Sequence, residues 1–523
     1  MRGGTAGCVL ASRLAEADPN LTILVIEQGM NNYNLPEVIH PALFPHNLFA
    51  NSKTALFWKG NKAPQLAHRE PVVPSGGTLG GGSSINWMVY TRAQRSDFDS
   101  WNTPGWTANE LWPFLKKFET YHGRGEKEHH GYRGPINVSS GTFRAIRAEN
   151  DFIDAAAKIG VEYRPNPKFQ PGQRVVRKVT ASKLVVVSAG ANGTPLILER
   201  SGVGDPDILK RAGVPVISAL PGVGNEYQDH HLTLYPYRTS LTSRETINAF
   251  ADGRFNVQEM IRKNDKLLGW NSMDASGKFR PTDAEVEALG PEFKKSWDRD
   301  FKNKPDRPLM IIALYSSYFG DHATLPDDAE YISMANWTAY PYSRGHIHIT
   351  GPNLSDPIDF DVGYLKDAND IDVKKHIWAY KTQREMFRRM KIFRGELATG
   401  HPRFPKGSKA AVVEKADGPV ADDAKRIVYT PEDDKAIEQH VRETVATTWH
   451  SLGTCKMAPR EKGGVVDASL SVYGVKGLKV ADLSVPPENV GGNTNNTALL
   501  IGEKAADIFI RELGLGGSYV SRI

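Results

Sequence analysis

The stretch Gly3-Gly4-Thr5-Ala6-Gly7 and the two segments that follow it decide the fold class. Residues 6–16 carry apolar side chains at helical spacing. Residues 21–27, Leu-Thr-Ile-Leu-Val-Ile-Glu, form a short β-branched run that predicts a buried parallel strand. A glycine turn, a helix and a strand ending in an acid are typical of a dinucleotide-binding unit, because glycines let the backbone pass close under a pyrophosphate at a helix N-terminus. Glu27 follows Gly7 by 20 residues, the spacing at which a carboxylate binds ribose hydroxyls.

The composition limits the classes of function. The 523 residues carry a net charge of +5 that is spread along the chain, too weak and dispersed to indicate a nucleic-acid partner. Two cysteines, Cys8 and Cys455, exclude a disulfide framework or a tetrathiolate zinc site, and we expect no metal site. No apolar run reaches the roughly 18 residues that cross a bilayer and no signal peptide opens the chain, so we expect an intracellular protein without a membrane partner.

Residues 76–86, Gly-Gly-Thr-Leu-Gly-Gly-Gly-Ser-Ser-Ile-Asn, form the densest glycine cluster in the chain. Such small residues let the backbone approach a flat or phosphorylated ligand, while Ser83, Ser84 and Asn86 supply polar contacts. A flexible loop is the alternative interpretation. The apolar residues that follow at once, 87–89, need a packing partner and favour the first interpretation.

Two further predicted strands and one change in the sequence pattern define the predicted domains. Residues 183–190 and 478–482 predict strands, the second ending in Asp482, and each is followed by helix signals. From about residue 236 to 440, charged helical stretches alternate with aromatic strands, which indicates a second domain. The predicted division is 1–115, 179–235 and 441–523 for a cofactor domain, 116–178 for a connecting segment, and 236–440 for a substrate domain.

The last eighty residues carry the strongest chemical signal. Residues 447–455 place His450 beside Trp449, and residues 489–497 set Asn493 among glycines in front of an apolar helix. Glycines beside Asn493 would let backbone N–H groups face a ligand, although an asparagine-rich turn is also a natural helix N-cap. A lone histidine is usually structural, and this chain has 15, so the spacing alone does not make His450 catalytic.

Together these motifs resemble the glucose–methanol–choline (GMC) oxidoreductases, a family of FAD-dependent alcohol oxidases and dehydrogenases. Residues 76–99 are similar to the first family signature and residues 190–204 to the second, and the His450 and Asn493 blocks also match. The four motifs occur in the same order as in the family. The match covers nearly the whole chain. Within the family, the motifs are most similar to fungal alcohol (methanol) oxidases.

The resemblance implies an α/β protein, α+β overall, with a Rossmann-like FAD-binding domain and a substrate domain of antiparallel sheet plus helices. It implies that a short primary alcohol becomes an aldehyde as hydride passes to flavin N5, and that O₂ then yields H₂O₂. His450 would be the base, Asn493 would hydrogen-bond the developing alkoxide, and the bulky Trp87 and Trp449 would shape a small pocket. Ile85 stands where relatives with covalent flavin have histidine, which implies non-covalent FAD. The FAD contacts implied by the resemblance are Gly3, Gly4, Gly7 and Glu27 for the ADP portion, Gly81, Gly82, Ser83 and Asn86 near the flavin or pyrophosphate, and Asp482 near the ribityl phosphate.

The sequence also departs from the family pattern. Relatives carry a strand before the glycine turn and a further glycine where Arg2 stands, and they continue through a long section near residues 169–177. An inactive, truncated homologue that cannot retain FAD is therefore an alternative, as is a GMC dehydrogenase with another electron acceptor. A nicotinamide dehydrogenase would share the glycine turn but gives no reason for the His450 and Asn493 blocks. Ser521-Arg522-Ile523 resembles a degenerate peroxisomal address, so we expect a peroxisomal or cytoplasmic location, and the family implies a homo-oligomer, an octamer in related oxidases.

Overall fold

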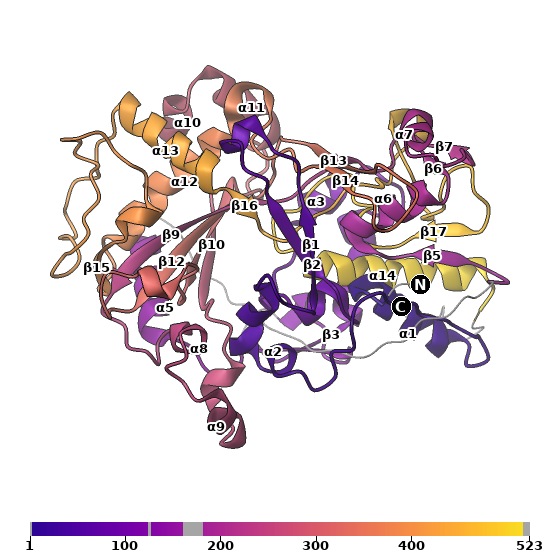
Figure 1. Cartoon of the computed structure of the whole chain (residues 1–523), viewed down its shortest axis with the longest axis horizontal. Coiled ribbons are helices and arrows are strands. Elements are labelled where there is room, and N and C mark those ends of the chain that lie inside the picture. Colours follow the sequence, from indigo (N-terminus) through magenta and orange to yellow (C-terminus); the bar gives the residue numbers. More distant parts are fainter. Residues whose placement is uncertain (1–2, 124–126, 160–180, 516–523) are drawn as a thin grey trace.

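The computed structural model describes residues 3–123, 127–159 and 181–515, which form a mixed α/β fold (Figure 1). The proposed gap near residues 169–177, Arg2 and the C-terminal tripeptide lie outside the described residues. The fold class predicted from the sequence is confirmed, whereas the domain boundaries remain a prediction.

The largest sheet has six strands and is antiparallel. Its order is β10-β11-β12-β9-β15, and β16 also pairs with β9. Every residue of β11 and β12 is buried, because helices and loops cover both faces of these strands. Helix α12 (Ile371–Phe387) packs on β11 and β12 and contacts α5 (Ile146–Lys158) and α13 (Pro431–Thr444) (Figure 1). These strands are β9 (His231–Thr239), β10 (Ala275–Phe279), β11 (Met310–Tyr315), β12 (Tyr331–Thr338), β15 (Phe393–Glu396) and β16 (Ala446–Thr447).

The glycine turn belongs to a second hydrophobic core, built around α1 (Thr5–Ala17) and α14 (Asn495–Glu512). These two helices pack closely, since a Cβ at Gly502 would lie only 2.7 Å from the Ala6 carbonyl oxygen. Beside them, β5 (Val185–Val187) and β17 (Leu478–Val480) form a parallel pair, and α6 (Gly190–Arg200) follows β5 directly. These helices and strands were predicted from the sequence, and the structure confirms them.

The strand predicted over residues 21–27 is wrong. The structure assigns no strand to these described residues, and Leu24 and Ile26 are 39% and 37% exposed. A parallel strand needs a neighbour that completes its backbone hydrogen bonds, and no described strand runs beside this segment. The apolar, β-branched composition was therefore insufficient, because strand formation depends on a pairing partner.

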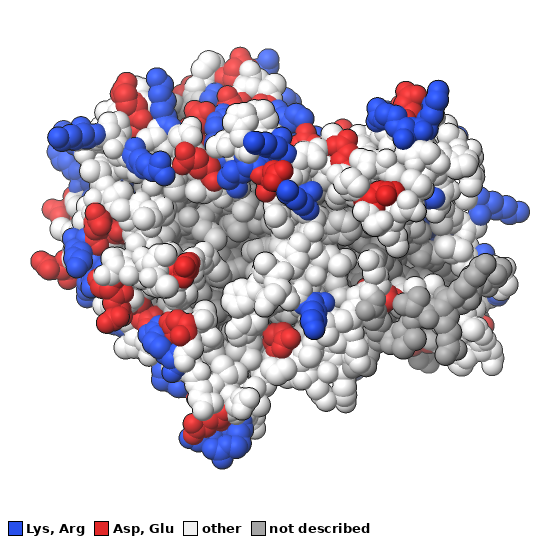
Figure 2. All heavy atoms as spheres, viewed as in Figure 1, with Lys and Arg blue, Asp and Glu red and all other residues white. Residues whose placement is uncertain are grey.

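Several smaller elements complete the described fold. The other strands are β1 (Ala55–Lys59), β2 (Val72–Gly76), β3 (Glu119–Tyr121), β4 (Ile136–Val138), β6 (Val203–Gly204), β7 (Ser218–Ala219), β8 (Asn225–Tyr227), β13 (Gly345–Ile349) and β14 (Ile358–Asp361). The other helices are α2 (Pro36–Ile39), α3 (Arg95–Ser100), α4 (Ala108–Lys117), α5 (Ile146–Lys158), α7 (Pro206–Arg211), α8 (Asn248–Ala251), α9 (Val257–Arg262), α10 (Asp283–Ala288), α11 (Pro291–Asp300), α12 (Ile371–Phe387) and α13 (Pro431–Thr444). No helix in the described part of the chain combines the length and apolar character that crossing a bilayer requires. Charges of both signs are intermingled on the face in Figure 2.

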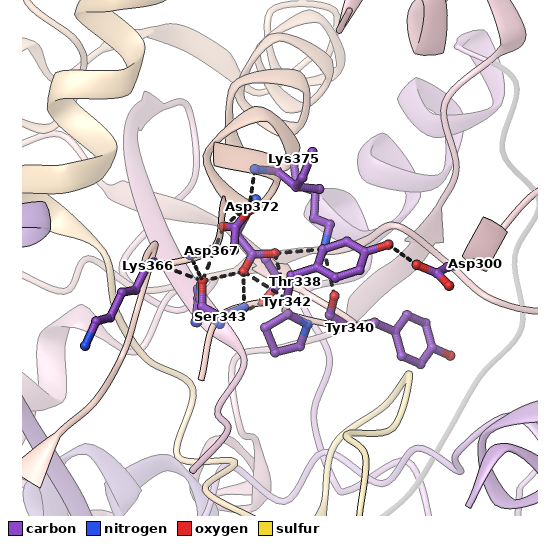
Figure 3. A network of polar contacts seen from close by, with 12 residues as sticks. Asp300, Thr338, Tyr340, Tyr342, Ser343, Lys366, Asp367, Asp372 and Lys375 are labelled. Atoms are coloured by element: carbon purple, nitrogen blue, oxygen red, sulfur yellow. Dashed lines mark hydrogen bonds and ion pairs between the residues drawn. The ribbon is translucent and has the colours of Figure 1, made fainter. Parts of the chain in front are cut away.

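A fully buried ion pair fixes the start of α12 against the segment that follows β12 (Figure 3). Lys375 Nζ donates to Asp372 Oδ1 at 2.8 Å and to the Tyr340 carbonyl at 2.7 Å. The Asp372 carboxylate also accepts the backbone N–H groups of Tyr342 and Ser343. Although burial alone would raise the pKa of Asp372, Lys375, His231 and the Ser343 hydroxyl hold it well below its usual value. The network holds residues 340–343 in place beside the functional site.

Candidate functional site

One cavity joins most of the residues that the sequence singled out. Four predicted residues, Gly3, Gly7, Ser83 and Ser84, do not line it. The predicted residues that do are Gly4, Glu27, Gly81, Gly82, Asn86, Trp87, Trp449, His450, Asp482 and Asn493. Segments from the start, middle and end of the chain therefore converge on one space.

The two glycine clusters lie against each other at one end of this cavity. Gly80 N donates to the Gly3 carbonyl at 2.6 Å, and Thr5 Oγ1 donates to the Gly80 carbonyl at 3.1 Å. Gly81 has a φ of +56°, and a Cβ there would lie 3.0 Å from the Gly4 Cα, so a side chain would be strained and crowded. The first turn of α1, whose backbone amides have no partners within the helix, thus opens beside a wall free of side chains.

Glu27 lines the cavity near this glycine wall and is buried. Its Oε1 accepts the backbone N–H of Gly29 at 2.6 Å. The residue therefore lines the cavity although the segment before it is not a strand. Asn86 also lines the cavity, with Oδ1 accepting the Met88 N–H at 2.8 Å.

Asp482 follows β17 and connects it to the start of α6. Its carboxylate accepts Gly190 N at 2.9 Å and the Thr194 hydroxyl at 2.6 Å. Burial raises the pKa of Asp482, and these donors oppose that effect. Beside it, Ser188 Oγ and Asn192 Oδ1 are buried with no hydrogen-bond partner among the described residues, and both residues line the cavity. The β5–α6 turn therefore offers polar atoms that a ligand would satisfy.

His450 and Asn493 meet at the other end. His450 Nε2 lies 3.3 Å from Asn493 Nδ2, and His450 Nδ1 lies 2.9 Å from His230 Nδ1. An amide nitrogen can only donate, so His450 Nε2 is the acceptor and the proton sits on Nδ1. His450 Nδ1–H then donates to His230 Nδ1. In this tautomer the lone pair of His450 Nε2 faces the cavity.

Burial keeps both histidines neutral. It lowers the pKa of His450 to about 3 and holds the pKa of His230 well below its usual value, with the neighbouring histidines adding to the effect on His230. A neutral imidazole retains a basic lone pair at neutral pH. His450 is therefore in the protonation state that a general base requires.

A strand irregularity turns His450 into the cavity. The β16–β9 ladder pairs Thr447 with His231, and the next bridge pairs Leu452 with Gln228, so two extra residues lie on the 447–452 side. Trp449, at the irregularity, has a φ of +60°, which is unusual for a bulky residue.

Asp229 stabilises this bend. Its Oδ1 accepts His450 N at 3.0 Å, and its Oδ2 accepts the Thr447 hydroxyl at 2.5 Å and the Tyr364 hydroxyl at 2.8 Å. Burial raises the pKa of Asp229 to about 6, against the effect of these donors.

Aromatic side chains surround the space next to His450. Trp87 lies at centroid distances of 4.4 Å from Tyr315, 4.8 Å from Phe319 and 5.8 Å from Trp449. Trp87 Nε1 donates to the Asn271 carbonyl at 2.9 Å, which fixes the ring. Trp87 therefore lines the cavity and also packs against the hydrophobic core.

The glycines beside Asn493 have a different use from the one expected. Gly491 N donates to Asp97 Oδ2 at 2.9 Å and Gly492 N donates to the Val490 carbonyl at 2.8 Å, so neither N–H is directed at a ligand. A Cβ at Gly491 would lie 2.3 Å from the Tyr340 hydroxyl. These glycines allow close approach of the loop to its neighbours.

Sequence reasoning missed four residues around the site. Asp229 and His230 were visible as an Asp-His-His run, but no spacing connects them with a histidine 220 positions later. Ser188 and Asn192 stand in a turn with the composition of an ordinary helix start.

The fold of this chain is also found in solved structures. An FAD-dependent oxidoreductase from Chaetomium thermophilum superposes with a TM-score of 0.78 at 23% identity, covering 98% of this chain and 99% of that one. A formate oxidase from Aspergillus oryzae gives 0.79 at 22% identity, covering 98% and 97%. These TM-scores establish a shared fold.

Sequence comparisons then identify the family. The N-terminal GMC oxidoreductase model matches residues 1–174 and 168–232, and the C-terminal model matches residues 341–502. An alcohol oxidase from Candida boidinii is 38% identical, covering 99% of this chain and 95% of that protein, and one from Pichia angusta is 36% identical over the same shares. The chain belongs to the GMC oxidoreductase family, as its motifs suggested, and is an oxidoreductase.

Family membership implies an FAD cofactor, and the residues present fit one. The side-chain-free wall at Gly4 and Gly81 leaves room for a pyrophosphate beside the α1 N-terminus. Ser188 Oγ and Asn192 Oδ1 have no hydrogen-bond partner among the described residues, so both are available to bond polar atoms of the cofactor. The cavity continues from there to His450, as an elongated dinucleotide requires.

Proposed function

We propose that this chain oxidises a short primary alcohol to the aldehyde with FAD as cofactor and O₂ as final electron acceptor. The pairing of His450 Nε2 with Asn493 Nδ2, 3.3 Å apart on the cavity wall, carries the proposal. The 38% identical relative named alcohol oxidase supports the substrate class. FAD, when bound, would supply the acceptor for the hydride that leaves the carbinol carbon, and O₂ would then take up the two electrons with two protons as H₂O₂.

His450 is the proposed base. As the hydride leaves and the C=O bond forms, the hydroxyl proton passes to the lone pair of His450 Nε2. Base assistance of this kind contributes about 10²–10⁴ in rate. The His450 Nδ1–H bond to His230 then lets His230 stabilise the imidazolium.

Asn493 is the proposed donor to the alcohol oxygen. Its Nδ2 and the His450 Nε2 line the same cavity, so one oxygen can meet both atoms. A neutral amide stabilises negative charge developing on that oxygen without changing its own protonation.

The residues implied for FAD keep their proposed roles. Gly3, Gly4, Gly7 and Glu27 would form the ADP end, Gly81, Gly82, Ser83 and Asn86 the middle, and Asp482 the ribityl-phosphate region; Gly3, Gly7 and Ser83 would act by shaping the turns. To these we add Ser188 and Asn192. Ile85 lines the cavity and has no nucleophilic atom, which supports non-covalent FAD.

The aromatic wall supports a small substrate. Trp87 and Trp449 narrow the space next to His450. A peroxisomal or cytoplasmic location would suit a producer of H₂O₂, and an octameric assembly stays a prediction of the family resemblance.

A spectrum of the purified protein tests this function. We expect flavin absorption bands that anaerobic methanol or ethanol bleaches and that air restores, with one H₂O₂ formed per aldehyde. A preparation that stays colourless after FAD is added would overturn the proposal in favour of an inactive homologue. Bleaching by alcohol without reoxidation by O₂ would instead indicate a dehydrogenase with another acceptor. Acid precipitation should release the flavin into the supernatant if it is non-covalent.

A further inference from the structure

In the described part of the chain, one side chain besides His450 holds the amide of Asn493. Thr91 Oγ1 lies 2.7 Å from the backbone N of Asn493 and 2.9 Å from Asn493 Oδ1. The backbone N–H can only donate, so it uses a lone pair of the Thr91 hydroxyl. The hydroxyl hydrogen then donates to Asn493 Oδ1, which leaves Nδ2 to face His450.

In the opposite orientation, the hydroxyl hydrogen of Thr91 would lose its acceptor. Asn493 Oδ1 would also face His450 Nε2, which would then have to carry the proton and would present no lone pair to the alcohol. The hydroxyl of Thr91 is therefore what distinguishes the two ends of an amide that are nearly equal in shape.

The segments that carry Thr91 and Asn493 lie close together. A Cβ at Gly492 would lie 3.1 Å from Thr91 Oγ1 and 3.1 Å from the Arg92 carbonyl oxygen, tighter than side chains normally pack. On the same two segments, Asp97 accepts Gly491 N at 2.9 Å and the Tyr340 hydroxyl at 2.6 Å. Tyr340 is in turn fixed through its carbonyl by Lys375 (Figure 3). The loop that carries Asn493 is thus anchored at Thr91 and again at Asp97.

We infer that Thr91 is a positioning residue of the reaction, whose hydroxyl sets the Asn493 amide so that its N–H, and not its carbonyl, meets the alcohol oxygen. This inference rests on the proposed function. Thr91 touches neither the substrate space nor His450 directly in the described contacts; it acts through Asn493.

A double-mutant cycle on the flavin-loaded enzyme tests the inference. Thr91→Val keeps the shape and removes the hydroxyl, Thr91→Ser keeps the hydroxyl, and Asn493→Ala removes the partner. We expect T91V to slow anaerobic flavin reduction by ethanol about tenfold or more, T91S to stay within about threefold of wild type, and T91V to change the rate less than about twofold in the N493A background. Thr350→Val, which removes an exposed hydroxyl bonded to the Pro357 carbonyl, is the matched control.

The pH profile separates positioning from a general loss of structure. A carbonyl turned toward His450 Nε2 favours the protonated imidazole, so T91V should raise the apparent pKa of flavin reduction, and T91S should not. Neutron diffraction from deuterated wild-type crystals should show both amide deuterons of Asn493 on the atom that faces His450.

Three outcomes would overturn the inference: a T91V rate equal to wild type, equal losses from T91V with and without Asn493, or an unchanged pH profile in a slowed T91V. If wild-type flavin is not reduced by any primary alcohol, the proposed function has failed, and the neutron map still decides the orientation of the amide.

Discussion

His450 Nδ1 and His230 Nδ1 lie 2.9 Å apart, and this contact sets which nitrogen of His450 faces the cavity. Replacing His230 by Leu removes the acceptor and leaves a buried N–H unsatisfied, which costs about 1–3 kcal/mol. We expect H230L to slow flavin reduction about tenfold or more. His230→Asn, whose carbonyl can accept in place of Nδ1, should lose less. Stopped-flow reduction rates check this, and equal rates in H230L and wild type would contradict the tautomer assignment.

His450 itself should be required for chemistry and dispensable for cofactor binding. His450→Ala removes the base while the glycine wall and the β5–α6 turn stay intact. We expect the flavin spectrum to persist and reduction by alcohol to slow by about 10²–10⁴. His122→Ala, at an exposed position, is the control. Near-normal reduction in H450A would show that another group takes the proton.

The size of the substrate should depend on Trp87. Its ring is enclosed by Phe44, Tyr315, Phe319 and Trp449, so Trp87→Phe enlarges the space beside His450. We expect kcat/KM for butanol to rise relative to methanol, because apolar chains gain room and contact. The series from methanol to butanol measures this. An unchanged chain-length preference would place Trp87 outside the substrate space, and Trp297→Phe, in α11, serves as the control.

Acid should destabilise the fold. Five buried histidines have pKa values lowered to about 3–4, chiefly by burial, whereas unfolded histidine titrates near 6.5: His231, His376, His401, His440 and His450. Between about pH 4 and 6.5 the unfolded chain binds more protons, so the free energy of unfolding falls as pH falls, by up to about 1.4 kcal/mol per histidine per pH unit.

Two carboxylates act in the opposite direction. Burial raises the pKa of Asp229 and Asp367 to about 6, so their contribution weakens as pH rises through that range. The five histidines change the free energy of unfolding more than the two carboxylates do. Urea unfolding should therefore give a lower free energy of unfolding at pH 5 than at pH 7. Equal stability at both values would mean that these histidines are not buried in neutral form. His122→Gln should leave the difference unchanged.

Removing one charge of the buried Lys375–Asp372 ion pair should lower the free energy of unfolding. Lys375→Met leaves an uncompensated charge in the interior, and we expect a loss of about 3–5 kcal/mol in the free energy of unfolding. The double variant Asp372→Asn/Lys375→Met should recover part of that loss. Thermal or urea unfolding measures both, with the exposed pair Lys263–Glu259 as the control. A double variant less stable than K375M would argue against charge burial as the cause.

Local patterns predicted the elements that depend on local chemistry. Helices α1 and α14 and strands β5 and β17 follow from apolar periodicity, and the motifs around His450 and Asn493 identified two of the cavity walls. Residues 21–27 have the composition of a strand, but the structure pairs no described strand with them, and pairing is a tertiary property. His230 and Thr91 act on groups 220 and 402 positions away, and only the folded chain places them in contact.

The two extra residues between the β16–β9 ladder and the Gln228–Leu452 bridge have a further consequence for how this site can vary. Deleting one residue there would shift the alternation of side chains and turn the imidazole out of the cavity, whatever residues remain. The number of residues between positions 447 and 452 is therefore more strictly constrained than the identity of most of them. Within the family, variation in substrate should accumulate by substitution in the aromatic wall, while insertions and deletions between positions 447 and 452 should be nearly absent.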